Sequence, residues 1–321
     1  MFNRLQQFRQ EAYKLLGKAK DATFELMDAV LLTRSVYSFA ELSLSPVFRR
    51  QWPSLYEALE DCRPKRHKLR KLYIKQVPKN ERVILGGDHT PWPRIEAETL
   101  KDRTFEHGAR VISGKPLTLG HGYSTIAWIP EDKGSWALPL CHERITSFET
   151  PITKAAWQLR QITRELGVRP LSFWDSEYGC ASFVNQTADI EADLVMRLRP
   201  NRCLWGVPPA YEGKGRPKKH GAKFKLSDPT SWGIPVESVE IDDQTWGKVQ
   251  IQRWRQLHFK GAADQEMEII LIQRQGTALS KKAAKPIWLA WHGVEMPPME
   301  QLWYQYLRRF AIEHWNRFAK Q

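Results

Sequence analysis

The central part of the chain alternates short apolar segments with amphipathic ones, and this order limits the folds that the chain can adopt. Three strands are predicted first, followed by a helix that begins at Pro151 and ends before Gly167, two residue types that commonly mark helix ends. A strand, a short helix and a further strand complete the pattern. Strands that alternate with helices in this way predict a mixed α/β sheet covered by helices. The predicted strands are "RVILGGDHT", "YSTIAWIPED", "GSWALPLCHERI", "RPLSFWDSEYG" and "ADLVMRLRP".

Two of the predicted strands lead into an aspartate. Asp88 follows the apolar run "VILGG", and Asp175 follows "LSFW". Apolar strands of this kind are buried, so both carboxylates are expected to emerge at an edge of the sheet. Taken alone, each aspartate is also typical of a turn or a helix cap at the end of a strand.

The C-terminal segment predicts a helix that begins near Met299 and carries a polar stripe. Tyr306, Arg309, Glu313 and Lys320 are spaced so that a helix of about 3.6 residues per turn places them on one stripe. A solvated face with an Arg–Glu pair is the simpler interpretation, and such a pair contributes only a few tenths of a kcal/mol. The alternative is that the two strand ends and this helix together supply three carboxylates for hard divalent cations, which prefer oxygen ligands.

The charge of the chain indicates a polyanionic partner. Lys and Arg number 49, Asp and Glu number 36, and the formal net charge is +13. No apolar run is long enough to span a bilayer, so we expect no membrane partner. The four cysteines have no metal-ligand spacing, which argues against a zinc site. Two basic segments are candidates for contacts with the polyanion, although each could equally be a solvated face. Their candidate residues are Lys68, Arg70, Lys71, Lys218 and Lys219.

The strand order, with Asp88 on the first strand and Asp175 on the fourth, resembles the ribonuclease-H-like DDE transposases. The last helix matches the signature Tyr-x2-Arg-x3-Glu-x6-Lys of bacterial insertion-sequence transposases of the cut-and-paste type, the YREK group. The long interval between Asp175 and Glu313 is similar too, because members of this group carry a β-rich insertion there. The stretch "GGDHTPWPR" resembles the first-aspartate region of one family in the group. The resemblance covers residues 79–321, and the N-terminal helices more weakly.

This resemblance implies four segments. Residues 1–78 would be a helical domain that binds DNA and ends in a basic linker, although a purely structural role for these helices stays open. Residues 79–200 would form the first part of a ribonuclease-H-like catalytic domain, a mixed sheet with flanking helices. Residues 201–286 would be the β-rich insertion, and residues 287–321 would supply the last strand and the catalytic helix.

The implied function is that of a DNA transposase, which cleaves transposon-end DNA and transfers the freed strand by a metal-dependent DDE mechanism. Asp88, Asp175 and Glu313 would be both catalytic and metal-binding, with two Mg²⁺ ions that Mn²⁺ can replace. The remaining members of the signature would bind DNA phosphates; they are Tyr306, Arg309 and Lys320.

Four further residues are candidates for the site. Relatives use an aromatic residue of the insertion to hold a flipped base, so Trp288 or Trp291 would stack on a base, although either tryptophan alone is more typical of a core. His89 and Glu177 neighbour the two aspartates. Glu177 would be an extra metal ligand or, more simply, a polar residue that supports the site.

The resemblance also implies partners and a location. The partner is DNA, at the element ends and at the target, and the protein would be a homodimer in the DNA complex and a monomer when free. The monomer is expected because relatives continue past the lysine into a pairing region, whereas this chain ends at Gln321. The location would be the bacterial cytoplasm, in association with the nucleoid. Two alternatives stay open: a truncated, non-transposing DNA-binding protein that acts as a repressor, and a related nuclease that cuts without joining.

Overall fold

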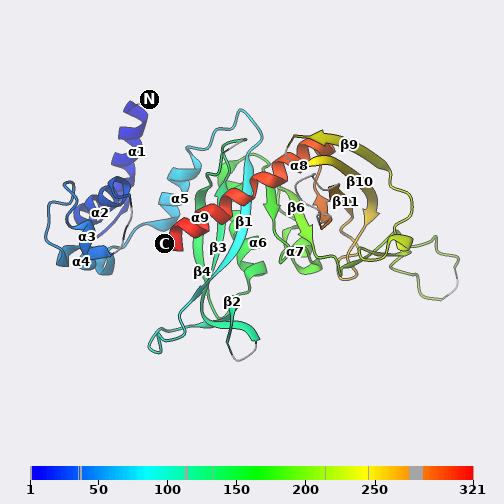
Figure 1. Cartoon of the computed structure of the whole chain (residues 1–321), viewed down its shortest axis with the longest axis horizontal. Helices are drawn as coiled ribbons and strands as arrows, with labels where there is room; N and C mark the ends of the chain where they lie inside the picture. Colours follow the sequence, from blue (N-terminus) through cyan, green and yellow to red (C-terminus); the bar gives the residue numbers. More distant parts are fainter. Residues whose placement is uncertain are drawn as a thin grey trace. The chain divides into compact units, whose positions relative to one another are not determined.

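The computed structural model describes residues 2–34, 36, 38–112, 115–132, 134–213, 215–244, 246–274 and 285–320 (Figure 1). The chain folds into two compact units, Met1–Val77 together with Ala319–Gln321, and Pro78–Phe318. Each unit has a hydrophobic core of its own. The boundaries of the four segments expected from the sequence, at residues 78, 200 and 286, remain predictions.

Helices build the N-terminal unit. They are α1 (Phe2–Leu15), α2 (Lys20–Leu32), α3 (Phe39–Leu42), α4 (Pro53–Asp61) and α5 (Arg66–Ile74). Local sequence sets several of their ends. Ser38 caps α3 by accepting a hydrogen bond from the backbone N–H of Glu41 at 3.3 Å, and Pro53 stands in the first turn of α4, where its missing N–H costs nothing. The core of this unit comprises Leu26, Ala29, Leu42, Phe48 and Leu55.

The second unit is built on one ten-stranded mixed sheet. The chain enters it through β1 (Ile84–Pro93), β2 (Thr104–Ile112), β3 (Lys115–Trp128) and β4 (Leu138–Ile145). β3 pairs antiparallel with each of the other three strands. The sequence predicted three strands here, and that number is wrong, because β2 and the first half of β3 form an additional hairpin arm.

A helix and the parallel part of the sheet follow. α6 (Pro151–Leu166) begins with a capping box between Thr150 and Thr153 and ends at Gly167, which adopts a positive φ of 65°. β5 (Leu171–Trp174), α7 (Ala181–Thr187) and β6 (Asp193–Leu198) come next, and β1, β5 and β6 run parallel. The strand order β4-β3-β1-β5-β6 confirms the predicted ribonuclease-H-like mixed sheet.

The β-rich insertion extends this same sheet. β7 (Cys203–Trp205) and β8 (Lys223–Lys225) form a small sheet of their own, and the short 3-10 helix η1 (Pro229–Ser231) follows them. β9 (Glu237–Asp243), β10 (Gly247–Leu257), β11 (Met267–Arg274) and β12 (Ile287–His292) continue the main sheet. β12 pairs antiparallel with β6, so backbone hydrogen bonds join the insertion to the ribonuclease-H-like part of the sheet.

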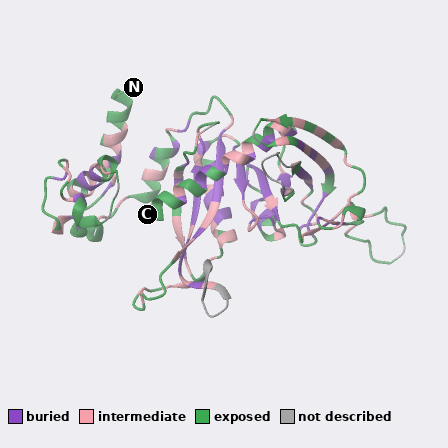
Figure 2. Cartoon of the chain, viewed as in Figure 1, coloured by how far each residue is buried: buried purple, intermediate pink, exposed green. Residues whose placement is uncertain are grey.

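The last segment forms two helices where the sequence predicted one. α8 (Met299–Arg308) and α9 (Phe310–Lys320) meet at Arg309, where backbone bonds of the tighter i to i+3 kind replace the helical ones. Both helices contribute to a core with one face of the sheet, in which Ile84, Phe173 and Val195 meet Leu302 and Ile312. Figure 2 shows the central strands of this unit as largely buried. α6 covers the opposite face, where its Gln158 is hydrogen-bonded to Ser124 of β3.

Candidate active site

Asp88 lies within β1, and the strand continues beyond it to Pro93. The prediction that the strand ends at this aspartate is therefore wrong. Gly87, directly before it, pairs with Trp174 of β5, and a Cβ at this position would overlap the indole ring of Trp174. Glycine is thus required for the two strands to lie in contact at this point.

Asp175 is the neighbour of Asp88 on the next strand. β1 and β5 are parallel, and Gly87 of β1 pairs with Trp174 of β5. Asp88 directly follows Gly87 and Asp175 directly follows Trp174, so the two aspartates lie side by side. Oδ1 of Asp175 accepts a hydrogen bond from the backbone N–H of Glu177 at 2.9 Å. This bond stabilises the turn that follows the strand. The fold therefore brings two carboxylates together that lie far apart in the sequence.

The last helix reaches the first of these aspartates. Asn316 of α9 donates a hydrogen bond from Nδ2 to Oδ2 of Asp88 at 2.7 Å. Glu313 lies one turn earlier, and its Oε1 accepts a hydrogen bond from Nη2 of Arg309 at 2.6 Å. The ring of Trp315 contacts that of His142 on β4, with centroids 5.1 Å apart, which helps to fix α9 on the sheet.

The neighbouring acids act on Asp88. Burial, with a smaller contribution from the carboxylates of Asp175 and Glu313, raises the pKa of Asp88 to about 7 against the opposing charges of Arg309 and His89. Burial also raises the pKa of Asp175, again against the charge of Arg309. A carboxyl whose pKa is raised by burial and by neighbouring acids, as that of Asp88 is, is typical of functional sites.

The polar stripe of the last helices is less exposed than the sequence predicted. Tyr306 is 1% and Arg309 3% exposed, whereas the side chain of Glu313 is 48% exposed. Phe173 of β5 packs edge-on against Tyr306, with ring centroids 6.1 Å apart, and this packing buries the start of the stripe. In this structure neither Tyr306 nor Arg309 offers an accessible group to a DNA phosphate, and their role as DNA contacts stays a prediction.

His89 lies between two glutamates. Its Nδ1 is 3.1 Å from Oε2 of Glu177, and its Nε2 is 3.0 Å from Oε2 of Glu106 on β2. Burial acts to lower the pKa of His89, but the bonds to both glutamates outweigh burial and raise it to about 9. Burial also opposes ionisation of Glu106, yet its ion pair with His89 and the hydrogen bond from Thr104 lower the pKa of Glu106. At neutral pH the imidazole of His89 is therefore protonated and carries a positive charge.

The predicted phosphate-contacting lysines lie at the surface. Lys68 and Lys71 are exposed on α5, whereas Arg70 is half-buried. The loop between β7 and β8 exposes Lys218 and Lys219 to solvent, and Lys320 is exposed near the end of α9. Exposure is what a phosphate contact requires, and these roles stay predictions.

The two tryptophans predicted to stack on a base lie in the interior. Trp288 and Trp291 are each 2% exposed. Trp288 packs among Phe224, Trp232 and Trp254, with ring centroids between 4.9 and 6.1 Å from its own. Neither ring has a free face in this structure, so base stacking by either residue stays a prediction that requires local repacking.

The chemistry of the acids fits a divalent cation. Within the described residues, no group of three or more acids, histidines or cysteines has a geometry that could hold a metal ion. Mg²⁺, however, is commonly bound through one or two carboxylates with waters and substrate phosphates. Asp88 and Asp175 each use one carboxylate oxygen in the hydrogen bonds described above, and Glu313 is held by Arg309. The two aspartates would hold an ion, and Glu313 would join them after leaving Arg309.

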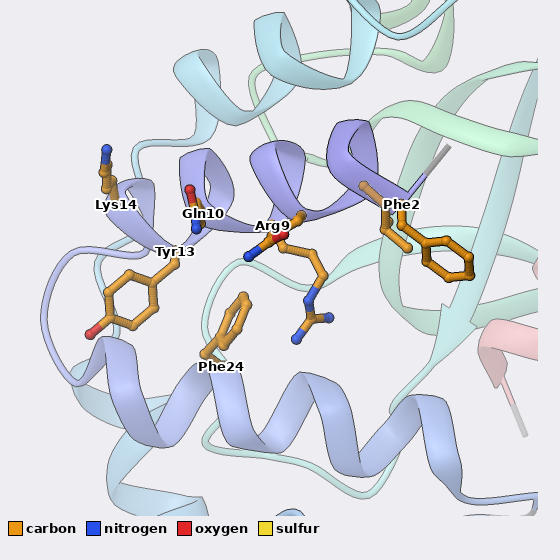
Figure 3. Close-up of a pocket in the computed structure, with 8 residues that line it drawn as sticks. Phe2, Arg9, Gln10, Tyr13, Lys14 and Phe24 are labelled. Carbon is orange, nitrogen blue, oxygen red and sulfur yellow. The ribbon is translucent and has the colours of Figure 1, made fainter.

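A pocket of about 610 Å³ lies apart from this chemistry, within the N-terminal unit (Figure 3). It lies between α1 and α2 and is lined mainly by apolar atoms, with Phe2, Tyr13 and Phe24 on its walls. Arg9 points toward it but is already bound to Asp28 at 2.8 Å. No cluster of acids or nucleophiles lines it, so the acid cluster is the stronger candidate for an active site.

Two residues around the acids were not predicted from the sequence. Asn316 lies about 20° from Arg309 on a helical wheel, so the helical spacing was a signal that could have revealed it. Glu106 lies on β2, a strand that the sequence did not predict, and it carried no such signal.

Comparison with known proteins adds the family. Residues 11–258 match the model of a family described as DDE superfamily endonuclease, a range that includes Asp88 and Asp175 and ends before α9. No curated protein matches the chain. Among the described residues, no helix has the length and apolar character that crossing a membrane requires. Since the match covers most of the length of the chain, the chain belongs to the DDE superfamily endonucleases, a family whose substrate is DNA.

Proposed function

We propose that this endonuclease is a transposase of the YREK-signature cut-and-paste group, which cleaves transposon-end DNA and joins the freed 3′ end to target DNA. Asp88, Asp175 and Glu313 are its catalytic acids in this proposal. The observation that carries it is the hydrogen bond from Asn316 to Asp88, because it docks the helix that bears Glu313 on the strand that bears Asp88.

Each part of the site has a physical task in this reaction. The acids would bind Mg²⁺ or Mn²⁺, which when bound stabilises the attacking and leaving oxygens of a phosphodiester. Arg309 supplies buried positive charge beside Glu313 and Asp88, which limits repulsion among the carboxylates in the protein alone. The exposed lysines of α5 and of the β7–β8 loop would bind the DNA backbone, as the net charge of +13 favours.

The substitution Glu313→Gln tests the assignment, because it keeps the shape of the side chain and removes its charge. Nicking of labelled transposon-end DNA with Mg²⁺ should fall by orders of magnitude, since the site loses an anionic oxygen. DNA binding at fixed salt should persist. Glu300→Gln, on α8, is the matched control and should nick like the parent. Parental levels of nicking by the Glu313→Gln protein would contradict the proposal.

The parent protein separates the alternatives. Nicking of end DNA without joined product would favour a nuclease that cuts only. Binding without nicking, in Mg²⁺ or Mn²⁺, would favour a repressor-like protein. We further propose that two protomers act together on DNA and that the free protein is a monomer, which light scattering with and without end DNA would measure.

A further inference from the structure

The ion pairs of His89 connect three separate segments of the second unit. His89 belongs to β1, Glu106 to β2, and Glu177 to the turn after β5. The imidazole lies 3.0 Å from one glutamate and 3.1 Å from the other, and its side chain is 10% exposed. Glu106 is held from its other side as well, because Thr104 donates a hydrogen bond to Oε1 at 2.8 Å. The bridge is therefore a closed arrangement of charges with little access to solvent.

This bridge lies on the face of the sheet opposite the acids. Neighbouring residues of a strand point to opposite faces. Asp88 pairs with Thr125 and is contacted by Asn316 of α9, whereas His89 pairs with Ser124, whose hydroxyl donates to Gln158 of α6. His89 is thus turned away from α9, and it acts on the site through other residues.

The backbone makes room for the bridge at one position. Gly122 of β3 lies beside it, and a Cβ there would lie 2.5 Å from Oε1 of Glu106 and 2.8 Å from Nε2 of His89. Both distances are shorter than a carbon atom tolerates, so any larger residue at position 122 would displace the bridge. A methyl group at this position disturbs the bridge without changing any charge.

We propose that His89 is a positioning residue of the candidate active site: by binding Glu106 and Glu177 together, it holds the turn that carries Asp175 against the strand that carries Asp88. The link to Asp175 is direct, because the backbone N–H of Glu177 donates the 2.9 Å hydrogen bond to Oδ1 of Asp175. The inference rests on the proposed function, since it assigns the bridge a purpose only if these two aspartates bind metal.

Loss of the imidazole has a definite consequence. Glu106 and Glu177 would face one another without a cation between them, and one member of a buried charge group without its partner is strongly unfavourable. Glu177 is the more exposed of the two glutamates, with 33% of its side chain accessible against 7% for Glu106, so it is the one that would move. Its movement would carry away the N–H that fixes Asp175.

The chain offers a matched control for this bridge. Lys154 of α6 also lies between two glutamates, 3.0 Å from Glu143 and 3.2 Å from Glu149, and its side chain is 11% exposed. It makes no contact with Asp88 or Asp175 in the described structure. His89→Ala and Lys154→Ala therefore remove a cation from similar surroundings, and only the first should affect the aspartates.

The experiment measures metal binding apart from catalysis. Tb³⁺ is titrated into the full chain without DNA, with luminescence as the readout, and the Mg²⁺ concentration for half-maximal nicking of end DNA is measured separately. His89→Ala should weaken Tb³⁺ binding about tenfold or more and raise the Mg²⁺ requirement to a similar extent, as loss of a supporting partner commonly does. Saturating Mg²⁺ should restore part of the nicking that His89→Ala loses at low Mg²⁺, because the defect lies in metal binding. Gly122→Ala should shift both metal readouts in the same direction.

Lys154→Ala should lower the melting temperature without changing either metal readout. Equal metal affinities for the His89→Ala, Lys154→Ala and parent proteins would overturn the inference while leaving the proposed function intact. A parent that binds no Tb³⁺ and nicks no DNA would overturn the proposed function itself. If His89→Ala does not fold, Glu106→Gln decides, since it removes one charge of the bridge and should still weaken Tb³⁺ binding.

Discussion

The side-chain amide of Asn316 donates a 2.7 Å hydrogen bond to Asp88, and this contact joins the last helix of the chain to the first strand of its sheet. Asn316 is buried, and its Oδ1 has no hydrogen-bond partner within the described part of the chain. Buried polar groups generally have a partner, so a water or a substrate group is expected at this oxygen. The last helix thus brings one more oxygen ligand or acceptor to the acids than the sequence signature contains.

Asn316→Asp should destabilise the metal-free protein, and more so at high pH. The new carboxylate would stand against that of Asp88 in place of a donor, and like charges at this distance disfavour ionisation of both. The free energy of unfolding, measured by urea denaturation, should therefore fall between about pH 5 and pH 8 more than it does for the parent. Asn185→Asp is the control: Asn185 donates to the carbonyl of Gly261 and makes no hydrogen bond to the three acids in the described structure, so its substitution should add no such pH dependence.

Asp88→Asn should stabilise the metal-free protein, with a gain that grows as the pH rises. Burial raises the pKa of Asp88 to about 7, above the value for an unfolded chain. A carboxyl with a raised pKa contributes stability below its unfolded pKa and loses it as the pH rises through the folded value. The parent should therefore lose stability from about pH 4 to pH 7 through this residue, and the Asn variant should not.

Denaturation in urea across that range, without divalent ions, measures the effect. His89 titrates with the same sign but at higher pH, between its ordinary value and about 9, so the difference between the two proteins below about pH 6 reports on Asp88. A stability difference that does not vary with pH would show that Asp88 is not the group responsible.

Arg309→Ala should make the protein dependent on metal for stability. Arg309 is the buried cation beside Glu313 and Asp88, and its loss leaves their charges uncompensated. The substitution should cost about 3 kcal/mol without metal. Mg²⁺ should raise the melting temperature of the variant more than that of the parent, because a bound cation replaces the lost charge.

Arg308→Ala provides the comparison for this effect. Arg308 is less buried than Arg309, with 11% of its side chain exposed against 4%, and it is paired at 2.7 Å with Asp132, which is not one of the three acids. Its loss should lower the melting temperature without adding any response to Mg²⁺. Equal responses of the two variants would mean that the cation does not bind where Arg309 acts.

The sequence predicted the parts of the site that follow from local pattern. Asp88 and Asp175 were found because each follows an apolar run, and apolar runs predict buried strands with little help from distant residues. Their adjacency then followed from the parallel order of the strands. The hydrogen bond between Arg309 and Glu313 was also accessible to sequence reasoning, because residues four apart on a helix are neighbours.

Features that depend on distant segments were not predictable in this way. β2 and the start of β3 contain glycines and a proline, which weaken the signal of a strand, and the two segments are paired mainly with each other. Glu106 was therefore missed together with its strand. The burial of Tyr306 was missed because a helical pattern shows which residues share a face but not what covers that face, and Phe173 covers it here.

The basic helix α5 gives the last prediction. Lys68 and Lys71 are exposed on it, and Arg70 is half-buried beside them. If these side chains contact phosphates, each contact releases counterions, and the slope of log affinity against log salt is about 0.9 for each phosphate neutralised. Replacement of all three by Gln should weaken binding to duplex DNA and reduce the slope by about 2 to 3. Binding titrations at several salt concentrations measure both quantities.

The control for α5 is a second triple substitution in the same unit. It replaces Lys14, Lys18 and Lys20 by Gln and so removes the same charge from exposed positions. This control variant should lose less affinity for DNA and keep a slope near that of the parent. An equal change in the two triple variants would show that overall charge, and not α5, determines binding.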